Sequence, residues 1–113
     1  MKLVTAANCR EIYDMLAGIP PMRGWRLPPS DAVEIKVRAM KDCFALYEPE
    51  PHTIVLSTLK NGHLDTLVRS IAHEMVHMKL YIKGDAHWHG HEHSFQELAD
   101  SVCDLLGFDP KEF

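Results

Sequence analysis

The sequence feature that most constrains the fold is a long run of helical apolar spacing in the second half of the chain. Beyond residue 63, apolar residues recur every three or four positions: Leu64, Leu67, Val68, Ile71, Met75, Met78 and Ile82. This spacing is typical of an amphipathic helix with one buried face. Gly84 follows, and glycine is common just past a helix C-terminus. We therefore predict a long helix from Leu64 to a stop at Gly84.

A metal-binding pattern falls inside this predicted helix. The segment His73-Glu74-Met75-Val76-His77 reads H-E-x-x-H. Four residues advance a helix by about 400° and roughly 6 Å, so both imidazoles project from nearly one face and can bind one ion. Glu74 points aside, where it can act as general base on a metal-bound water. The pattern predicts a zinc hydrolase with His73 and His77 as ligands.

A third ligand is expected, because catalytic zinc usually has three protein ligands and one open position. The loop after the helix offers His87, His89, His91 and His93. Glu97 is a further candidate, although its spacing from Ser94 also fits a helix cap. The residues alone leave this choice open.

Two supporting roles are also unassigned by the sequence. An oxyanion stabiliser is needed for attack on a carbonyl, and the candidates are Tyr81, His87, His89 and His93. A carboxylate that orients a ligating imidazole is expected beside such sites, and Glu92 or Asp100 could provide it.

The first half of the chain predicts a helix and a small sheet. Thr5 could cap a helix that ends at Gly18. Alternating apolar and charged residues over positions 33–38 predict a strand, and short strands are expected at 43–47 and 53–57, separated by a Glu-Pro-Glu-Pro turn. A last helix is expected to begin near Ser94 with Ser94 and Glu97 as a capping box, and to end at Gly107. The predicted class is α+β, with a small antiparallel sheet of about three strands and three helices.

Composition limits the functions to consider. Residues 1–113 suit one domain of ordinary globular composition, with 46% hydrophobic and 25% charged residues. The net charge of −4 gives no general reason to bind nucleic acid. Three cysteines, Cys9, Cys43 and Cys103, form neither a disulfide framework nor a zinc ribbon. No signal peptide or membrane-spanning run is visible, so a cytoplasmic location is predicted.

These elements together resemble the SprT-like (Spartan-like) zinc metalloproteases. The resemblance rests on the strand Ile54 to Ser57, the HEMVH helix, and His91 followed four residues later by Phe95. It extends over roughly residues 32–108. Glu92 departs from the pattern, because the family usually has glycine there. The cysteine zinc ribbon of some members is also absent from these residues.

The resemblance implies a zincin-like fold and a specific site. His73, His77 and His91 would bind one zinc ion per chain, and Glu74 would polarise the water that attacks a peptide carbonyl. A protein or peptide substrate is implied, with proteins associated with DNA as the suggested class and DNA itself as a potential activator. We expect the substrate strand to pair with the sheet edge near Ile54 to Ser57.

Two other functions remain to be distinguished. A zinc hydrolase acting on RNA or another non-peptide substrate would need a basic groove, which the charge of −4 does not favour. A non-catalytic zinc-binding module would have its ion closed by four protein ligands instead of three.

Overall fold

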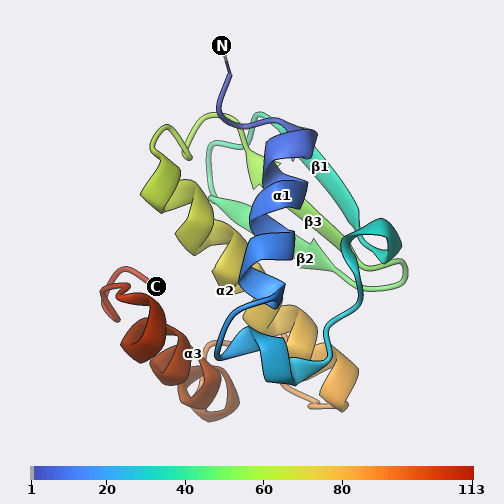
Figure 1. Cartoon of the computed structure of the whole chain (residues 1–113), viewed down its shortest axis with the longest axis vertical. Helices are drawn as coiled ribbons and strands as arrows, with labels where there is room; N and C mark the ends of the chain where they lie inside the picture. Colours follow the sequence, from blue (N-terminus) through green and yellow to red (C-terminus); the bar gives the residue numbers. More distant parts are fainter. Residues whose placement is uncertain (1) are drawn as a thin grey trace.

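The computed structural model describes residues 2–113 as three helices around a three-stranded sheet (Figure 1). The elements, in chain order, are α1 (Ala6–Ala17), the short 3-10 helices η1 (Met22–Trp25) and η2 (Ser30–Ala32), β1 (Glu34–Arg38), β2 (Ala45–Glu48), β3 (Thr53–Ser57), α2 (Leu64–Lys83) and α3 (His93–Leu106). The predicted α+β class, with three strands and three helices, is confirmed. None of the helices in residues 2–113 is long and apolar enough to cross a bilayer.

The sheet is mixed, with the strand order β1-β3-β2. β2 pairs with β3 antiparallel, as a short hairpin requires, but β1 pairs with β3 in parallel. The prediction of a wholly antiparallel sheet is therefore wrong for β1. The period-two pattern of a strand reports its buried face and not its neighbour, and here the chain passes from β1 to the far edge before β3 returns between them.

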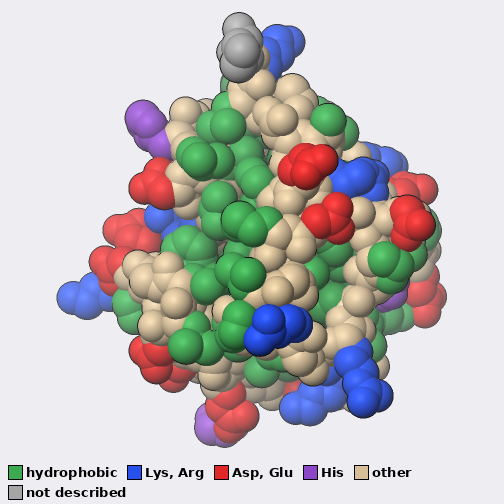
Figure 2. Space-filling model, viewed as in Figure 1, with side chains coloured by type: hydrophobic (Ala, Val, Ile, Leu, Met, Phe, Trp, Pro, Cys, Tyr) green, Lys and Arg blue, Asp and Glu red, His purple; other side chains and the backbone are tan. Residues whose placement is uncertain are grey.

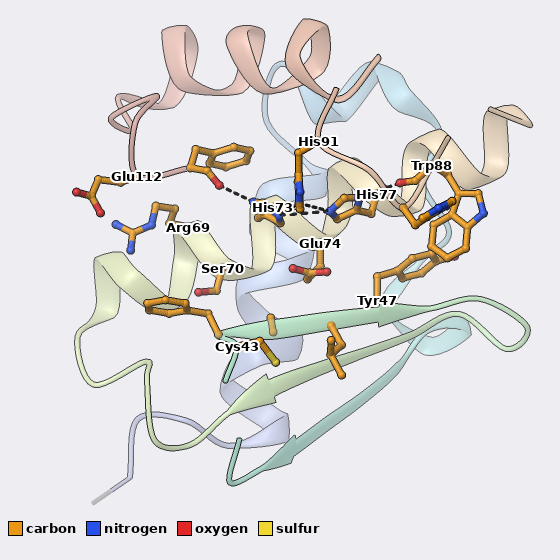
Figure 3. Close-up of a pocket in the computed structure, with 15 residues that line it drawn as sticks. Cys43, Tyr47, Arg69, Ser70, His73, Glu74, His77, Trp88, His91 and Glu112 are labelled. Atoms are coloured by element: carbon orange, nitrogen blue, oxygen red, sulfur yellow. Dashed lines mark hydrogen bonds between the residues drawn. The ribbon is translucent and has the colours of Figure 1, made fainter. Parts of the chain in front are cut away.

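The position of β3 corrects a second expectation. All five residues of β3 are buried, and the strand has a partner on both sides. The segment Ile54 to Ser57 therefore offers no free edge for a substrate strand. The sheet edges are β1 and β2, and β2 is the edge that lies against α2 (Figure 3).

The core lies between the sheet and the helices α1 and α2. Thr5 caps α1 as predicted, because its hydroxyl accepts a hydrogen bond from the Asn8 amide at 3.1 Å. Tyr13 of α1 is fully buried, and its hydroxyl donates to the Pro28 carbonyl at 2.6 Å. In α2 the middle of the apolar stripe is buried as predicted. Its two ends are not, because Leu64 and Ile82 are 58% and 42% exposed.

α3 starts one residue before the predicted position. Its N-cap is Glu92, which makes no side-chain capping bond, so the expected capping box of Ser94 and Glu97 is wrong. The Ser94 hydroxyl bonds to Asp85, and Glu97 pairs with His93 at 2.7 Å. The predicted end is confirmed, since Gly107 has the left-handed φ of 81° that favours glycine.

The charged surface around this core is mixed. On the face drawn in Figure 2, Lys and Arg side chains alternate with Asp and Glu around a central strip of apolar residues. No single-sign stripe of the kind that tracks a nucleic-acid backbone is visible on that face.

Candidate metal centre

His73 and His77 stand one turn apart on α2 and point towards His91, whereas Glu74 points towards β2 (Figure 3). Their Nε2 atoms lie 3.3 Å apart, so both ring edges point at the same place. His77 is only 6% exposed, and His73 is half-buried. The helix backbone thus holds two imidazole nitrogens together in a partly dry environment, where they could bind a metal ion.

His91 brings a third imidazole to the same place from the loop before α3. Its Nε2 lies 3.1 Å from that of His73 and 3.2 Å from that of His77. Nitrogens bound to one zinc ion at 2.0–2.1 Å in tetrahedral geometry would be separated by about 3.3 Å. The three histidines could therefore hold a metal ion, and their spacing is compatible with zinc.

Main-chain oxygens set the tautomers of the two helical histidines. Nδ1 of His73 lies 2.6 Å from the Phe113 main-chain oxygen, and Nδ1 of His77 lies 2.7 Å from the Trp88 carbonyl. A carbonyl only accepts, so each Nδ1 carries the proton and donates it. Each Nε2 then directs a lone pair into the triangle, which is the state that binds a cation.

Burial keeps these imidazoles neutral. Desolvation, with the neighbouring His77, lowers the pKa of His73 to about 4, against the Phe113 hydrogen bond that raises it. Desolvation likewise lowers the pKa of His77. Three lone pairs converging without a proton between them are best satisfied by a metal ion.

Glu74 lies between α2 and β2, next to the histidines in Figure 3. Its side chain is 7% exposed, and it accepts a hydrogen bond from the Tyr47 backbone amide. Desolvation raises its pKa to about 8, although the Tyr47 bond acts in the opposite direction. A cation bound by the adjacent histidines would lower that pKa, because opposite charge favours the carboxylate. Without a bound cation, the buried Glu74 carboxyl is thus protonated at neutral pH more readily than an ordinary glutamate.

The histidines and Glu74 open into one pocket of about 510 Å³. One wall is β2 with the two residues before it, and the other is α2, with the loop before α3 and the C-terminal residues closing the ends (Figure 3). The lining residues are Cys43, Phe44, Ala45, Leu46, Tyr47, Arg69, Ser70, His73, Glu74, His77, Trp88, His89, His91, Glu112 and Phe113. The candidate metal ligands therefore face a cleft large enough for a segment of polypeptide.

A comparison with protein families identifies the chain. The model of the SprT-like family matches residues 22–111, which include the sheet, α2, His91 and α3. The chain belongs to the SprT-like family. This confirms the resemblance inferred from the sequence, and the match extends further towards both ends than residues 32–108. No curated protein and no solved structure gives a significant match.

The other candidate ligands and supporting residues named from the sequence do not lie with His73, His77 and His91 in this SprT-like domain. His93 and Glu97 form a surface pair, with side chains 88% and 64% exposed. The Tyr81 hydroxyl donates to Glu50. His87 and Asp100 are exposed, and Glu92 serves as the N-cap of α3. Only His89 also lines the pocket, as an exposed side chain beside Trp88.

Sequence reasoning missed several groups that shape the site. The Trp88 and Phe113 oxygens and the Tyr47 amide are main-chain atoms, for which side-chain patterns carry no signal. Arg69, which also lines the pocket, could have been found, because it lies four residues before His73 on the same helix face.

Proposed function

We propose that this SprT-like protein is a zinc-dependent peptidase in which His73, His77 and His91 hold one zinc ion and Glu74 is the general base. The observation that carries the proposal is the triangle of three Nε2 atoms at 3.1–3.3 Å, with a buried carboxyl beside it in the same pocket. Zinc, when bound, lowers the pKa of its water to about 7 and polarises a carbonyl.

The other chemical roles belong to residues of the chain. Glu74 accepts the proton of the attacking water and returns it to the leaving amine. Its raised pKa supports this role. An ordinary carboxyl has a pKa far below neutral pH and is therefore too weak a base to take the proton from water. The Tyr47 amide holds the carboxylate on the β2 side of the cleft.

The edge of β2 supplies main-chain groups for an extended substrate. The Phe44 carbonyl accepts from the Ser57 amide, so main-chain groups at this position point towards β3. Directions alternate along a strand, so the main chains of Ala45 and Tyr47 point the other way, to the free edge of β2, where the Tyr47 amide binds Glu74 and the other groups can pair with a substrate. A substrate strand can add to this edge in place of the one first expected at β3.

Two observations favour a peptidase over the other functions. Among residues 2–113, the metal-binding group holds three side chains and not four, which leaves a ligand position open as in catalytic zinc sites. Arg69 is the only Lys or Arg among the pocket-lining residues, whereas a cleft for RNA would carry a basic track. Activation by DNA and a preference for DNA-associated proteins remain predictions from the family resemblance.

The test is a metal-dependent hydrolysis assay. The purified protein should bind about one zinc per chain and cleave a denatured protein substrate, with or without added DNA. A chelator should abolish cleavage, and returning zinc should restore it. Stoichiometric zinc with no cleavage of any protein substrate, in the presence or absence of single- or double-stranded DNA, would favour the non-catalytic zinc module.

A further inference from the structure

The two ends of the pocket differ in charge. One end is formed by Cys43, Phe44 and Arg69, and Arg69 is the only Lys or Arg side chain that lines the pocket. Arg69 precedes His73 by one helical turn, so its side chain leaves α2 on the same flank as the histidines. Figure 3 places Arg69 beyond His73, away from the Tyr47 and Trp88 end.

The guanidinium of Arg69 is free to bind a ligand. Within residues 2–113, the ion pairs are Lys36 with Glu34 and His93 with Glu97, and no side-chain hydrogen bond involves Arg69. Glu112 lies near Arg69 in Figure 3 but stays beyond ion-pair distance. The planar fork of five N–H donors therefore has no carboxylate within ion-pair distance, and this fork is the geometry that recognises a carboxylate bidentately.

An exposed aromatic ring, that of Phe44, lies at the same end of the pocket, with Lys60 over it. The Phe44 side chain is 44% exposed in the pocket wall, which is unusual for a residue of its size. The Lys60 ammonium lies 5.2 Å from the centre of the Phe44 ring. Lys60 does not itself line the pocket, so its charge acts only through its position over the Phe44 ring, which offers the cleft an apolar surface. This combination suits a group with a short aliphatic stem and a carboxylate.

The direction of β2 indicates which part of a substrate would reach this end. β2 runs from Ala45, next to Phe44, to Glu48, next to Tyr47. Antiparallel pairing is the commoner arrangement for an added strand. A substrate paired antiparallel with β2 runs from the Tyr47 end to the Phe44 end. Its residues beyond the cleaved bond, towards its C-terminus, then lie beside Arg69.

We infer that Arg69 and Phe44 form a subsite that binds a substrate carboxylate on the C-terminal side of the cleaved bond. This inference rests on the proposed peptidase function and specifies its substrate class. The carboxylate can come from an Asp or Glu side chain or from a free peptide C-terminus. Glu112, which faces the same guanidinium, competes weakly with it.

The experiment measures binding without hydrolysis, so that it stands apart from the peptidase test. The probes are fluorescein-labelled octapeptides of Ala, Val and Gly with one Glu or Gln placed at each position in turn, each made as a free acid and as a C-terminal amide. Binding to the zinc-loaded Glu74→Gln protein is followed by fluorescence anisotropy. Binding is also measured for four variants that each combine Glu74→Gln with a second substitution: Arg69→Gln, Arg69→Lys, Glu112→Gln or Arg23→Gln. Arg23 is an exposed arginine outside the pocket lining, so Arg23→Gln is the matched control.

The peptide with Glu at one position, or with the free C-terminus, should bind about two- to fivefold more tightly than its neutral counterpart, as expected for a partly exposed ion pair. The preference should fall to about one in Arg69→Gln, persist in part in Arg69→Lys, stay unchanged in the control Arg23→Gln, and rise in Glu112→Gln. Preference for internal Glu or for the free terminus tells the two carboxylate sources apart. Equal binding of acidic and neutral peptides, or no binding of either, would overturn the inference, even if wild-type protein cleaves peptides.

Discussion

The three candidate ligands are held in two different ways. His73 and His77 project from the middle of α2, where the helix is packed against the sheet, and their Nδ1 atoms are fixed by main-chain oxygens. His91 comes from an exposed loop, and its own main-chain carbonyl accepts only from the exposed Gln96 side chain at 3.2 Å. The helix therefore holds two of the three candidate ligands in place before any metal binds, whereas the loop supplies the third. Metal should therefore order the loop more than the helix.

The largest expected effect is that of His77→Ala, which breaks the helical half. If three histidines and a water share the roughly 10–16 kcal/mol of a zinc site equally, losing one histidine weakens zinc binding by about a hundredfold or more. The substitution also leaves a cavity and removes the partner of the buried Trp88 contact, so unfolding of the metal-free protein should become easier by about 1–3 kcal/mol. Zinc competition titrations and urea unfolding measure the two effects. Unchanged zinc affinity would exclude His77 as a ligand.

His91→Ala should separate binding from folding. Zinc affinity should again fall by about a hundredfold, because one ligand of similar strength is lost. The metal-free protein should keep its stability within about 0.5 kcal/mol, because the side chain is exposed. His89→Ala is the matched control from the same loop. If His89→Ala lowered zinc affinity and His91→Ala did not, the loop ligand would be misassigned.

The buried Glu74 should lower the stability of the metal-free protein at high pH. Its carboxyl ionises near pH 4.5 in the unfolded chain and near 8 in the fold, so the folded state binds the extra proton in between. Stability of the metal-free protein should therefore fall as pH rises from 4.5 through 8. Glu74→Gln should remove that loss and be more stable above pH 8 by on the order of 2–4 kcal/mol.

The acid side of the same profile serves as the internal control. The His73 pKa falls to about 4 in the fold from 6.5, so the unfolded state binds more protons between these values. Both wild type and Glu74→Gln should lose stability as pH falls from 6.5 to 4. Urea unfolding of chelator-treated protein from pH 4 to pH 9 checks both limbs, and parallel curves for the two proteins between pH 4.5 and 8 would contradict the burial assigned to Glu74.

A smaller effect is expected from the segment that supports His73. Deleting Glu112 and Phe113 removes the main-chain oxygen that accepts from His73 Nδ1, together with the Phe113 ring packed 5.3 Å from the His73 ring. Removing such an outer partner lowers metal affinity by about tenfold. Phe113→Ala keeps the main-chain acceptor and should lose less. Equal losses in both variants would assign the effect to ring packing instead of the hydrogen bond.

The smallest expected effect is that of His93→Ala, which tests the exposed end of the loop. His93 pairs only with Glu97, and an exposed ion pair contributes about 0.2–1 kcal/mol. Zinc affinity should be unchanged. A loss of zinc comparable with that of His91→Ala would mean that the loop presents a different histidine to the ion.

The same division between helix and loop decides what the sequence could predict. The α2 stripe and H-E-x-x-H register follow from helical geometry, so the placement of His73 and His77 on one flank, with Glu74 turned aside from them, is implied by local spacing. The choice of His91 came only from the family resemblance, because a loop has no period that fixes where a side chain points. Strand pairing was also out of reach, since the pattern of β1 is the same for a parallel or antiparallel neighbour.

The central claim is that Glu74 is the base of a zinc peptidase, and Glu74→Gln tests it most directly. Glutamine keeps the size of the side chain but cannot take a proton from water. The account predicts that zinc-loaded Glu74→Gln retains about one zinc per chain while peptide hydrolysis falls by at least about a hundredfold, the lower range for a general base. A variant that holds zinc and hydrolyses as fast as wild type would contradict it.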